Sequence, residues 1–179
     1  MLLRYTSELV GKQGSGPFQR RVSEPPVFLY QRDQTNPILL EGTVLRGYQR
    51  GRQLLGCPTA NLSVEPYQQL LQSLDCGIYF GWASLQKKLP VYRTVVSVGW
   101  NPVFENDQKT IEAHLMADLE DFYGQHLSLL LLGFIRREFK FPSVPALEAA
   151  IAEDKWVAEK ALELEDCIVC KSEWESTLG

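Results

Sequence analysis

A glycine-rich segment at residues 47–61 has the composition of a loop that binds anions. Gly47, Gly51 and Gly56 let the backbone approach a ligand closely, and successive N–H groups in such a loop can bind phosphate oxygens. The spacing of Gly51 and Gly56 matches the first half of a P-loop, but Cys57-Pro58 stands where Lys-Ser/Thr would follow. An exposed tight turn is the alternative, and the residues alone favour it.

Two oxygen-bearing side chains follow these glycines. Thr59 and Asn61 are two positions apart, so in an extended segment their side chains point to the same side. A hydroxyl and an amide oxygen are suitable ligands for Mg²⁺ beside bound phosphates. This pair is therefore a candidate metal site.

A single carboxylate, Glu112, interrupts the mostly apolar stretch 110–119. As a strand, this stretch places Ile111, Ala113 and Leu115 on one face and Glu112 on the other. A helix fits the same letters, but the flanking turn residues favour a strand. A partly buried carboxylate can act as a general base, whereas a solvated strand carboxylate is the plainer interpretation and is favoured by spacing alone.

Aromatic residues and arginines that could act together occur in two further segments. Tyr123 falls in Asp121-Phe122-Tyr123-Gly124, and Arg136 falls in Phe134-Ile135-Arg136-Arg137. Such pairs can stack on a flat ring, although core aromatics and surface arginines are the more common outcome.

The elements that must position these residues are mostly strands. Strand-forming residues predict strands at 38–45, 77–84, 92–98 and 127–135, in addition to 110–119. One helix is predicted after Ser143, which can cap it, with Pro145 in the first turn and Leu147, Ile151, Ala158 and Leu162 at helical spacing. Several short strands and one late helix indicate a small antiparallel barrel with a helix outside.

The first 37 residues differ from the remainder. They are rich in glycine, proline and glutamine, and only 27–30 resembles a short strand. We expect an N-terminal extension over 1–37 and a barrel domain with helix and tail over 38–179. A slight excess of basic residues in the extension leaves organelle targeting open, although its acidic residues weaken that case.

Composition narrows the possible functions. The chain has 179 residues, of which 45% are hydrophobic and 22% charged, and a net charge of −4, which argues against nucleic-acid binding. The longest apolar run, 127–135, is too short to span a bilayer, and no secretory signal is evident. Cys167 and Cys170 form a CxxC without two further ligands for zinc, so we expect free thiols in a reducing cytoplasm. A monomer is the default expectation.

Together these segments resemble the riboflavin kinase family. The resemblance covers residues 38–163 and is strongest in Pro58-Thr59-Ala60-Asn61 and Asp121-Phe122-Tyr123-Gly124. It extends to Gly77-Ile78-Tyr79, Ser97-Val98-Gly99-Trp100-Asn101-Pro102 and Glu112-Ala113-His114-Leu115. The resemblance implies a six-stranded antiparallel Greek-key barrel with a C-terminal helix, and ATP:riboflavin 5′-phosphotransferase activity that yields FMN.

The resemblance also implies residue roles. Gly47, Gly51 and Gln53 would contact the ATP phosphates, with Gln53 standing where the family often has lysine. Thr59 and Asn61 would bind the metal-nucleotide, with Mg²⁺ expected and Zn²⁺ or another divalent ion as the alternative. Glu112 would be the catalytic base. Riboflavin would lie near Leu115, Tyr123 and Arg136, and Gln49 and Phe139 are further departures from the family pattern.

Three alternatives remain for comparison. A bifunctional riboflavin kinase and FAD synthetase would need an H-x-G-H motif, and His114 and His126 do not have that spacing. A flavin-binding barrel without activity is opposed by the intact Thr59, Asn61 and Glu112. A barrel that binds oligonucleotides is opposed by the acidic composition and by the lack of a basic aromatic strand face.

Overall fold

The computed structural model describes residues 27–28, 36–46, 59–63, 65–100, 109–138 and 140–179. Its elements, in chain order, are β1 (Val27–Phe28), β2 (Ile38–Leu45), β3 (Ala60–Leu62), a 3-10 turn η1 (Glu65–Tyr67), α2 (Gln68–Ser73), β4 (Gly77–Leu85), β5 (Val91–Trp100), β6 (Lys109–Leu115), β7 (His126–Arg137), α3 (Val144–Leu162) and α4 (Glu165–Glu175). The predicted strands are all present, and the first six residues of the ambiguous segment 110–119 belong to strand β6, which spans Lys109–Leu115.

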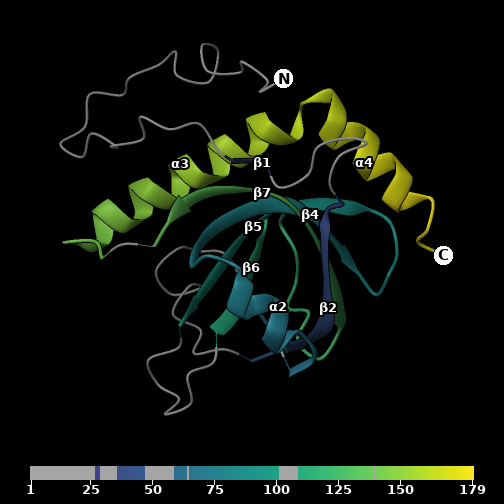
Figure 1. The fold of residues 1–179 in the computed structure, drawn as a ribbon, viewed down its shortest axis with the longest axis horizontal. Helices are drawn as coiled ribbons and strands as arrows, with labels where there is room; N and C mark the ends of the chain where they lie inside the picture. The colour runs from purple at the N-terminus through teal and green to yellow at the C-terminus, as the bar shows by residue number, and fades with distance from the viewer. Residues whose placement is uncertain (1–26, 29–35, 47–58, 64, 101–108, 139) are drawn as a thin grey trace.

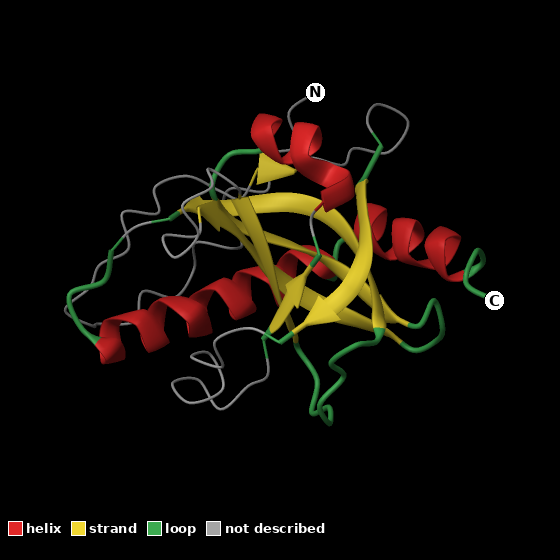
Figure 2. Cartoon of the chain, turned by 90° about the horizontal axis from the view of Figure 1, so that it is seen from below, coloured by secondary structure: helices red, strands yellow, loops and turns green. Residues whose placement is uncertain are grey.

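Six of the strands close into an antiparallel barrel (Figures 1 and 2). The order around it is β2-β3-β6-β5-β4-β7, and β7 closes the circle because it pairs with β4 along one edge and with β2 along the other. Strands β6, β5 and β4 are joined by hairpins, and β3 returns by a long connection to lie beside β6, which is a Greek key. The predicted fold class is confirmed.

Two hydrophobic cores stabilise this arrangement. The interior core fills the barrel with side chains such as Leu40, Val96, Ile111 and Leu129, all fully buried. The outer core lies between the barrel wall and the C-terminal helices, and it contains Phe80, Trp82, Leu132, Ala158, Ala161 and Leu162. The wall strands β4 and β7 are therefore buried on both faces, which explains their nearly continuous apolar sequences.

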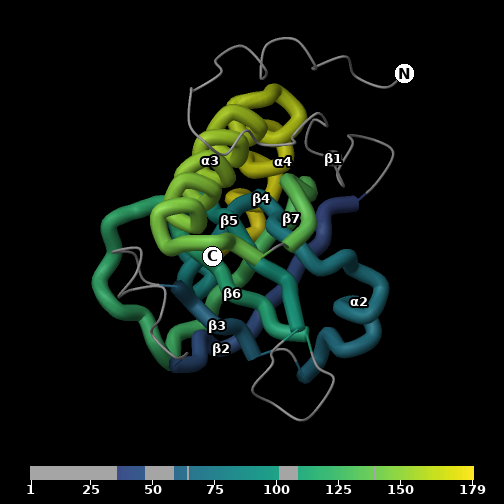
Figure 3. Tube along the Cα trace, turned by 90° about the vertical axis from the view of Figure 1, so that its left-hand side faces the viewer, coloured from purple at the N-terminus to yellow at the C-terminus, as the bar shows by residue number. Residues whose placement is uncertain are grey.

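The predicted closing helix is confirmed as α3. The Ser143 hydroxyl accepts a hydrogen bond from the Ala146 N–H at 3.3 Å, and a proline occupies the first turn as expected. Figure 3 shows α3 and α4 on the same side of the barrel, with α2 elsewhere. The sequence did not predict α2 or α4; α2 falls in a segment without an assigned element, and α4 falls in the predicted C-terminal tail.

A tight turn joins the strands β4 and β5, and two cysteines contribute to the outer core. Gln86 and Lys87 have φ values of 55° and 54°, and they form the tight turn between β4 and β5, where the Lys88 N–H donates to the Leu85 carbonyl. The CxxC cysteines are free thiols on α4, and both are buried in the outer core. Burial, then the neighbouring Cys170 and Asp166, raise the pKa of Cys167 to about 12.

The N-terminal segment contributes one pairing to the sheet. Strand β1 lies within the predicted extension, and it pairs with Phe134 and Gly133 of β7, beyond the end of β2. The division at residue 37 stays a prediction. No helix in the described part of the chain is long and apolar enough to cross a membrane.

Candidate active site

Asn61 and Glu112 lie directly opposite each other on the neighbouring strands β3 and β6. Their flanking residues Ala60, Leu62 and Ile111 belong to the interior core, so both polar side chains point out of the barrel. Directly paired residues on one face of a sheet have Cβ atoms about 4.5–5.5 Å apart. The register therefore brings together an amide and a carboxylate from distant segments.

A row of outward-facing residues continues this pair around the barrel. Ser97 of β5 lies opposite Glu112, Ile78 of β4 lies opposite Ser97, and Arg136 of β7 lies opposite Ile78. Asn61, Glu112 and Ser97 are each partly buried. Within the described residues, no hydrogen bond or ion pair engages the Asn61 amide or the Glu112 carboxylate, so both are available to a ligand.

Thr59 directly precedes β3 and is also partly buried. Thr59 and Asn61 offer hard oxygen ligands beside the Glu112 carboxylate, a donor set that suits Mg²⁺. The described residues hold no group of three or more His, Cys, Asp or Glu side chains able to bind a metal. Magnesium in nucleotide sites is usually held by one or two protein groups together with phosphates, so the oxygen ligands present fit that ion.

The turn that contains Tyr123 is attached to β2. Gly124 donates its N–H to the Val44 carbonyl at 2.9 Å, and the Val44 N–H donates to the Gln125 carbonyl at 2.9 Å. Gly124 has φ of 76°, a left-handed conformation that explains the glycine of this motif. The Arg46 guanidinium lies 5.4 Å from the Tyr123 ring centroid. An aromatic-cation pair thus sits at the barrel end where β2 leads toward residues 47–58.

Leu115 is buried in the interior core and Arg136 is bound to another side chain, two arrangements that the sequence does not indicate. Leu115 is 3% exposed and belongs to the interior core. Arg136 binds Asp154 of α3 through two hydrogen bonds, Nε to Oδ1 at 2.8 Å and Nη2 to Oδ2 at 2.6 Å. Its guanidinium also lies 5.5 Å from the Phe141 ring centroid. Sequence reasoning missed Asp154, because an acidic residue in a predicted helix is usually solvated.

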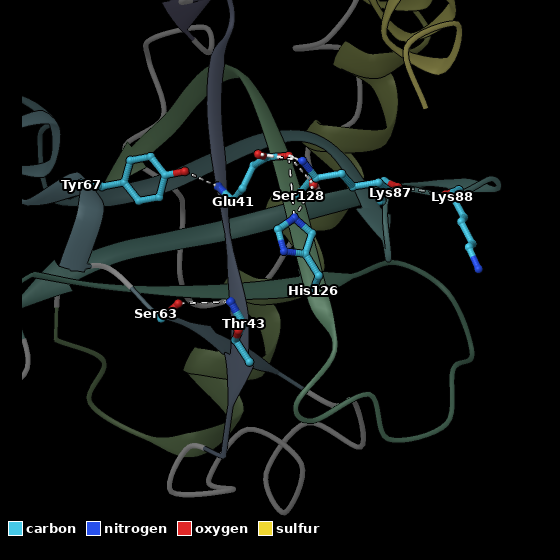
Figure 4. A network of polar contacts seen from close by, with 9 residues as sticks. Glu41, Thr43, Ser63, Tyr67, Lys87, Lys88, His126 and Ser128 are labelled. Carbon is cyan, nitrogen blue, oxygen red and sulfur yellow. Dashed lines mark hydrogen bonds and ion pairs between the residues drawn. The ribbon is translucent and has the colours of Figure 1, made fainter. Parts of the chain in front are cut away.

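A separate polar network lies on the outer face of β2 and β7 (Figure 4). Ser128 donates to Glu41 at 2.9 Å, Lys87 donates to the same carboxylate at 3.2 Å, and the Glu41 N–H donates to the Tyr67 hydroxyl at 2.8 Å. Burial acts to raise the pKa of Glu41, but the Ser128 hydrogen bond and the Lys87 ammonium outweigh it, and the pKa is lowered. Glu41 is thus fully engaged, and this network holds the β2–β7 seam together.

Comparison with known proteins identifies the family of this chain. The model of the riboflavin kinase family matches residues 34–162. The chain belongs to the riboflavin kinase family. It is 40% identical over 138 residues to human riboflavin kinase, a match that covers 76% of this chain and 88% of the human protein.

Other family members differ in length and in the activities that they carry. A bifunctional riboflavin kinase/FMN phosphatase of Arabidopsis thaliana is 49% identical over 130 residues, which cover 72% of this chain. This chain spans only 34% of that relative's length. The crystal structure of riboflavin kinase from Trypanosoma brucei superposes with a TM-score of 0.61 at 25% identity, covering 75% of this chain and 85% of the other.

The family match covers the region that holds the sequence motifs, and the role of each site residue is a prediction. The structure brings Asn61 and Glu112 together, with Thr59 two residues from Asn61. It places Tyr123 near Arg46 at one end of the barrel and directs Arg136 toward α3. Gly47, Gly51 and Gln53, and the departures at Gln49 and Phe139, lie outside the described residues.

Proposed function

We propose that this chain is a riboflavin kinase, which transfers the γ-phosphate of ATP to the 5′-hydroxyl of riboflavin and releases FMN and ADP. The observation that carries the proposal is the cross-strand pair of Asn61 and Glu112, on a barrel that belongs to this family. Related proteins from human and Trypanosoma brucei carry the same activity in their names.

Glu112 is the general base in this proposal. The 5′-oxygen of riboflavin attacks the γ-phosphorus, a new O–P bond forms, and the bond between that phosphorus and the bridging oxygen of ADP breaks. The proton of the hydroxyl passes to Glu112. An ionised carboxylate is a pure hydrogen-bond acceptor, and Glu112 has both oxygens uncommitted among the described residues, so it can orient the hydroxyl and accept its proton.

Thr59 and Asn61 would hold a divalent ion, expected to be Mg²⁺, with Zn²⁺ or another divalent ion as the alternative. When bound, the ion would neutralise the charge of the ATP phosphates, the main requirement of phosphoryl transfer. The residues at Gly47, Gly51 and Gln53 would bind the same phosphates. Leu115, Tyr123 and Arg136 would line the riboflavin site, Leu115 as part of the wall and Tyr123 through its ring.

The assay for this function is chromatography of the flavin after the protein is incubated with riboflavin, ATP and Mg²⁺, with EDTA in a parallel sample. The proposal predicts conversion to FMN that stops when EDTA removes the metal. Riboflavin that stays bound and unphosphorylated would contradict the proposal and support a flavin-binding barrel without activity.

Three broader expectations accompany the proposal. The chain would divide into an N-terminal extension at 1–37 and the barrel domain at 38–179, the protein would be a monomer, and it would act in the cytoplasm. Light scattering of the purified chain tests the monomer, and limited proteolysis near residue 37 tests the division.

A further inference from the structure

A second carboxylate, Glu138, lies on the same outer face as Glu112. Glu138 follows the last residue of β7, and its Oε1 is 3.4 Å from the Ser97 hydroxyl, the distance of a weak hydrogen bond. Ser97 is the direct cross-strand neighbour of Glu112. One serine therefore separates the two carboxylates.

Gly99 gives a second, independent reason for this placement. It lies two residues beyond Ser97 on β5 and faces the same way, about 6.7 Å further along the strand. A Cβ atom added at Gly99 would lie 2.3 Å from Glu138 Oε1 and 2.8 Å from Oε2. Because Gly99 has no side chain, the Glu138 carboxylate can rest directly on the backbone of β5.

The end of β7 is held firmly just before Glu138. Arg136 and Asp154 have side chains only 12% and 4% exposed, and their two hydrogen bonds join β7 to α3. This anchor limits how far the chain can move two residues later. The backbone of Glu138 is thus held by the nearby Arg136–Asp154 pair, and its carboxylate is held by Ser97 and the backbone at Gly99.

The Glu138 head group has unused capacity to accept hydrogen bonds. An ionised carboxylate offers about four acceptor positions. Among the described residues, Ser97 is its one hydrogen-bond donor, and no described Lys, Arg or His side chain forms an ion pair with it. Glu138 is exposed, so the remaining positions face solvent beside Glu112. A ligand with several hydroxyl groups would satisfy them.

We propose that Glu138 is a specificity residue that accepts hydrogen bonds from the hydroxyls of the ribityl chain and so directs its terminal hydroxyl to Glu112. This inference rests on the proposed function, because it takes riboflavin as the acceptor. Glu138 lies about two strand residues from Glu112 along the same face, which suits contacts to hydroxyls further up the same polyol chain.

The test compares the binding of two flavins by fluorescence quenching without ATP: riboflavin, and lumiflavin, which carries a methyl group in place of the ribityl chain. Glu138→Ala should weaken riboflavin binding roughly ten- to hundredfold, the loss of hydrogen bonds to a charged group, and leave lumiflavin binding unchanged. Equal losses for both flavins, or no loss for riboflavin, would overturn the proposal.

Three further variants separate position, charge and general effects. Gly99→Ala keeps the Glu138 charge but displaces its carboxylate, so riboflavin binding should fall while lumiflavin binding is retained. Glu138→Gln keeps one acceptor oxygen and should lose less than Glu138→Ala. Glu173→Ala removes an exposed glutamate from α4 and should change neither affinity. Thermal unfolding of Gly99→Ala checks that the barrel is intact.

These experiments distinguish a failure of the Glu138 inference from a failure of the proposed kinase function. A wild-type chain that binds riboflavin but forms no FMN would contradict the kinase proposal and leave the Glu138 comparison measurable. A Glu138→Ala variant that binds riboflavin normally, while wild type forms FMN, would overturn this inference alone. A raised Mg²⁺ requirement in Glu138→Ala with unchanged riboflavin affinity would assign Glu138 to the metal instead, and a wild type that binds neither flavin would overturn both proposals.

Discussion

Asn61 and Glu112 are neighbours because of strand register, although they are far apart in the sequence. The alternation around Glu112 was predictable, since Ile111, Ala113 and Leu115 form an apolar face. The pairing of β6 with β3 was not predictable, because β3 has only three residues, too few to show a recognisable hydrophobic pattern. At the residue scale, the sequence indicates candidate side chains, and the barrel determines which of them meet.

The metal role of Asn61 leads to a prediction at this scale. Asn61→Ala removes an amide oxygen next to Glu112, so the Mg²⁺ concentration for half-maximal rate should rise at least about tenfold. The affinity for riboflavin, measured without nucleotide, should stay close to that of wild type. Thr177→Ala is a control, because Thr177 is an exposed polar residue beyond the end of α4, on a different element from the Asn61–Glu112 pair. An unchanged Mg²⁺ dependence in Asn61→Ala would remove Asn61 from the metal site.

At the scale of elements, the C-terminal helices were only partly predictable. The Ser143 cap and the early proline define the start of α3, as expected. The helix α4 was missed because its apolar face is narrow, and its contribution to the outer core comes from Cys167, Cys170 and the partly buried Trp174. The helix α2 was missed because it is short and uncapped, and Lys109 of β6 binds its terminal carbonyl groups at Leu71 and Leu74.

The buried Arg136–Asp154 pair connects β7 to α3, and its removal should destabilise the fold. Asp154→Ala leaves the Arg136 guanidinium buried without its partner, which costs about 3–5 kcal/mol in the free energy of unfolding. The double variant Arg136→Met with Asp154→Ala should lose less, because no uncompensated charge remains. Urea denaturation measures both. A loss below about 1 kcal/mol in Asp154→Ala would show that the pair does not hold α3.

At the scale of the whole molecule, the barrel and its outer helix followed from the strand count and the family resemblance. The strand pairs that close the barrel did not, because closure depends on β7 pairing with β4 on one side and with β2 and then β1 on the other. A strand buried on both faces looks in sequence like any apolar run, and nothing local identifies its partners. The closed barrel is what places Asn61, Glu112 and Ser97 on one outer face.

The central claim is that the outer face at Glu112 is where phosphate is transferred. The most direct measurement is the rate of FMN formation by Glu112→Gln and by wild type at saturating ATP, Mg²⁺ and riboflavin, with riboflavin binding measured for both. The account predicts a rate roughly 10²–10⁴-fold lower with riboflavin affinity retained, because the variant keeps its shape and loses its base. A Glu112→Gln variant that forms FMN at the full rate would contradict it.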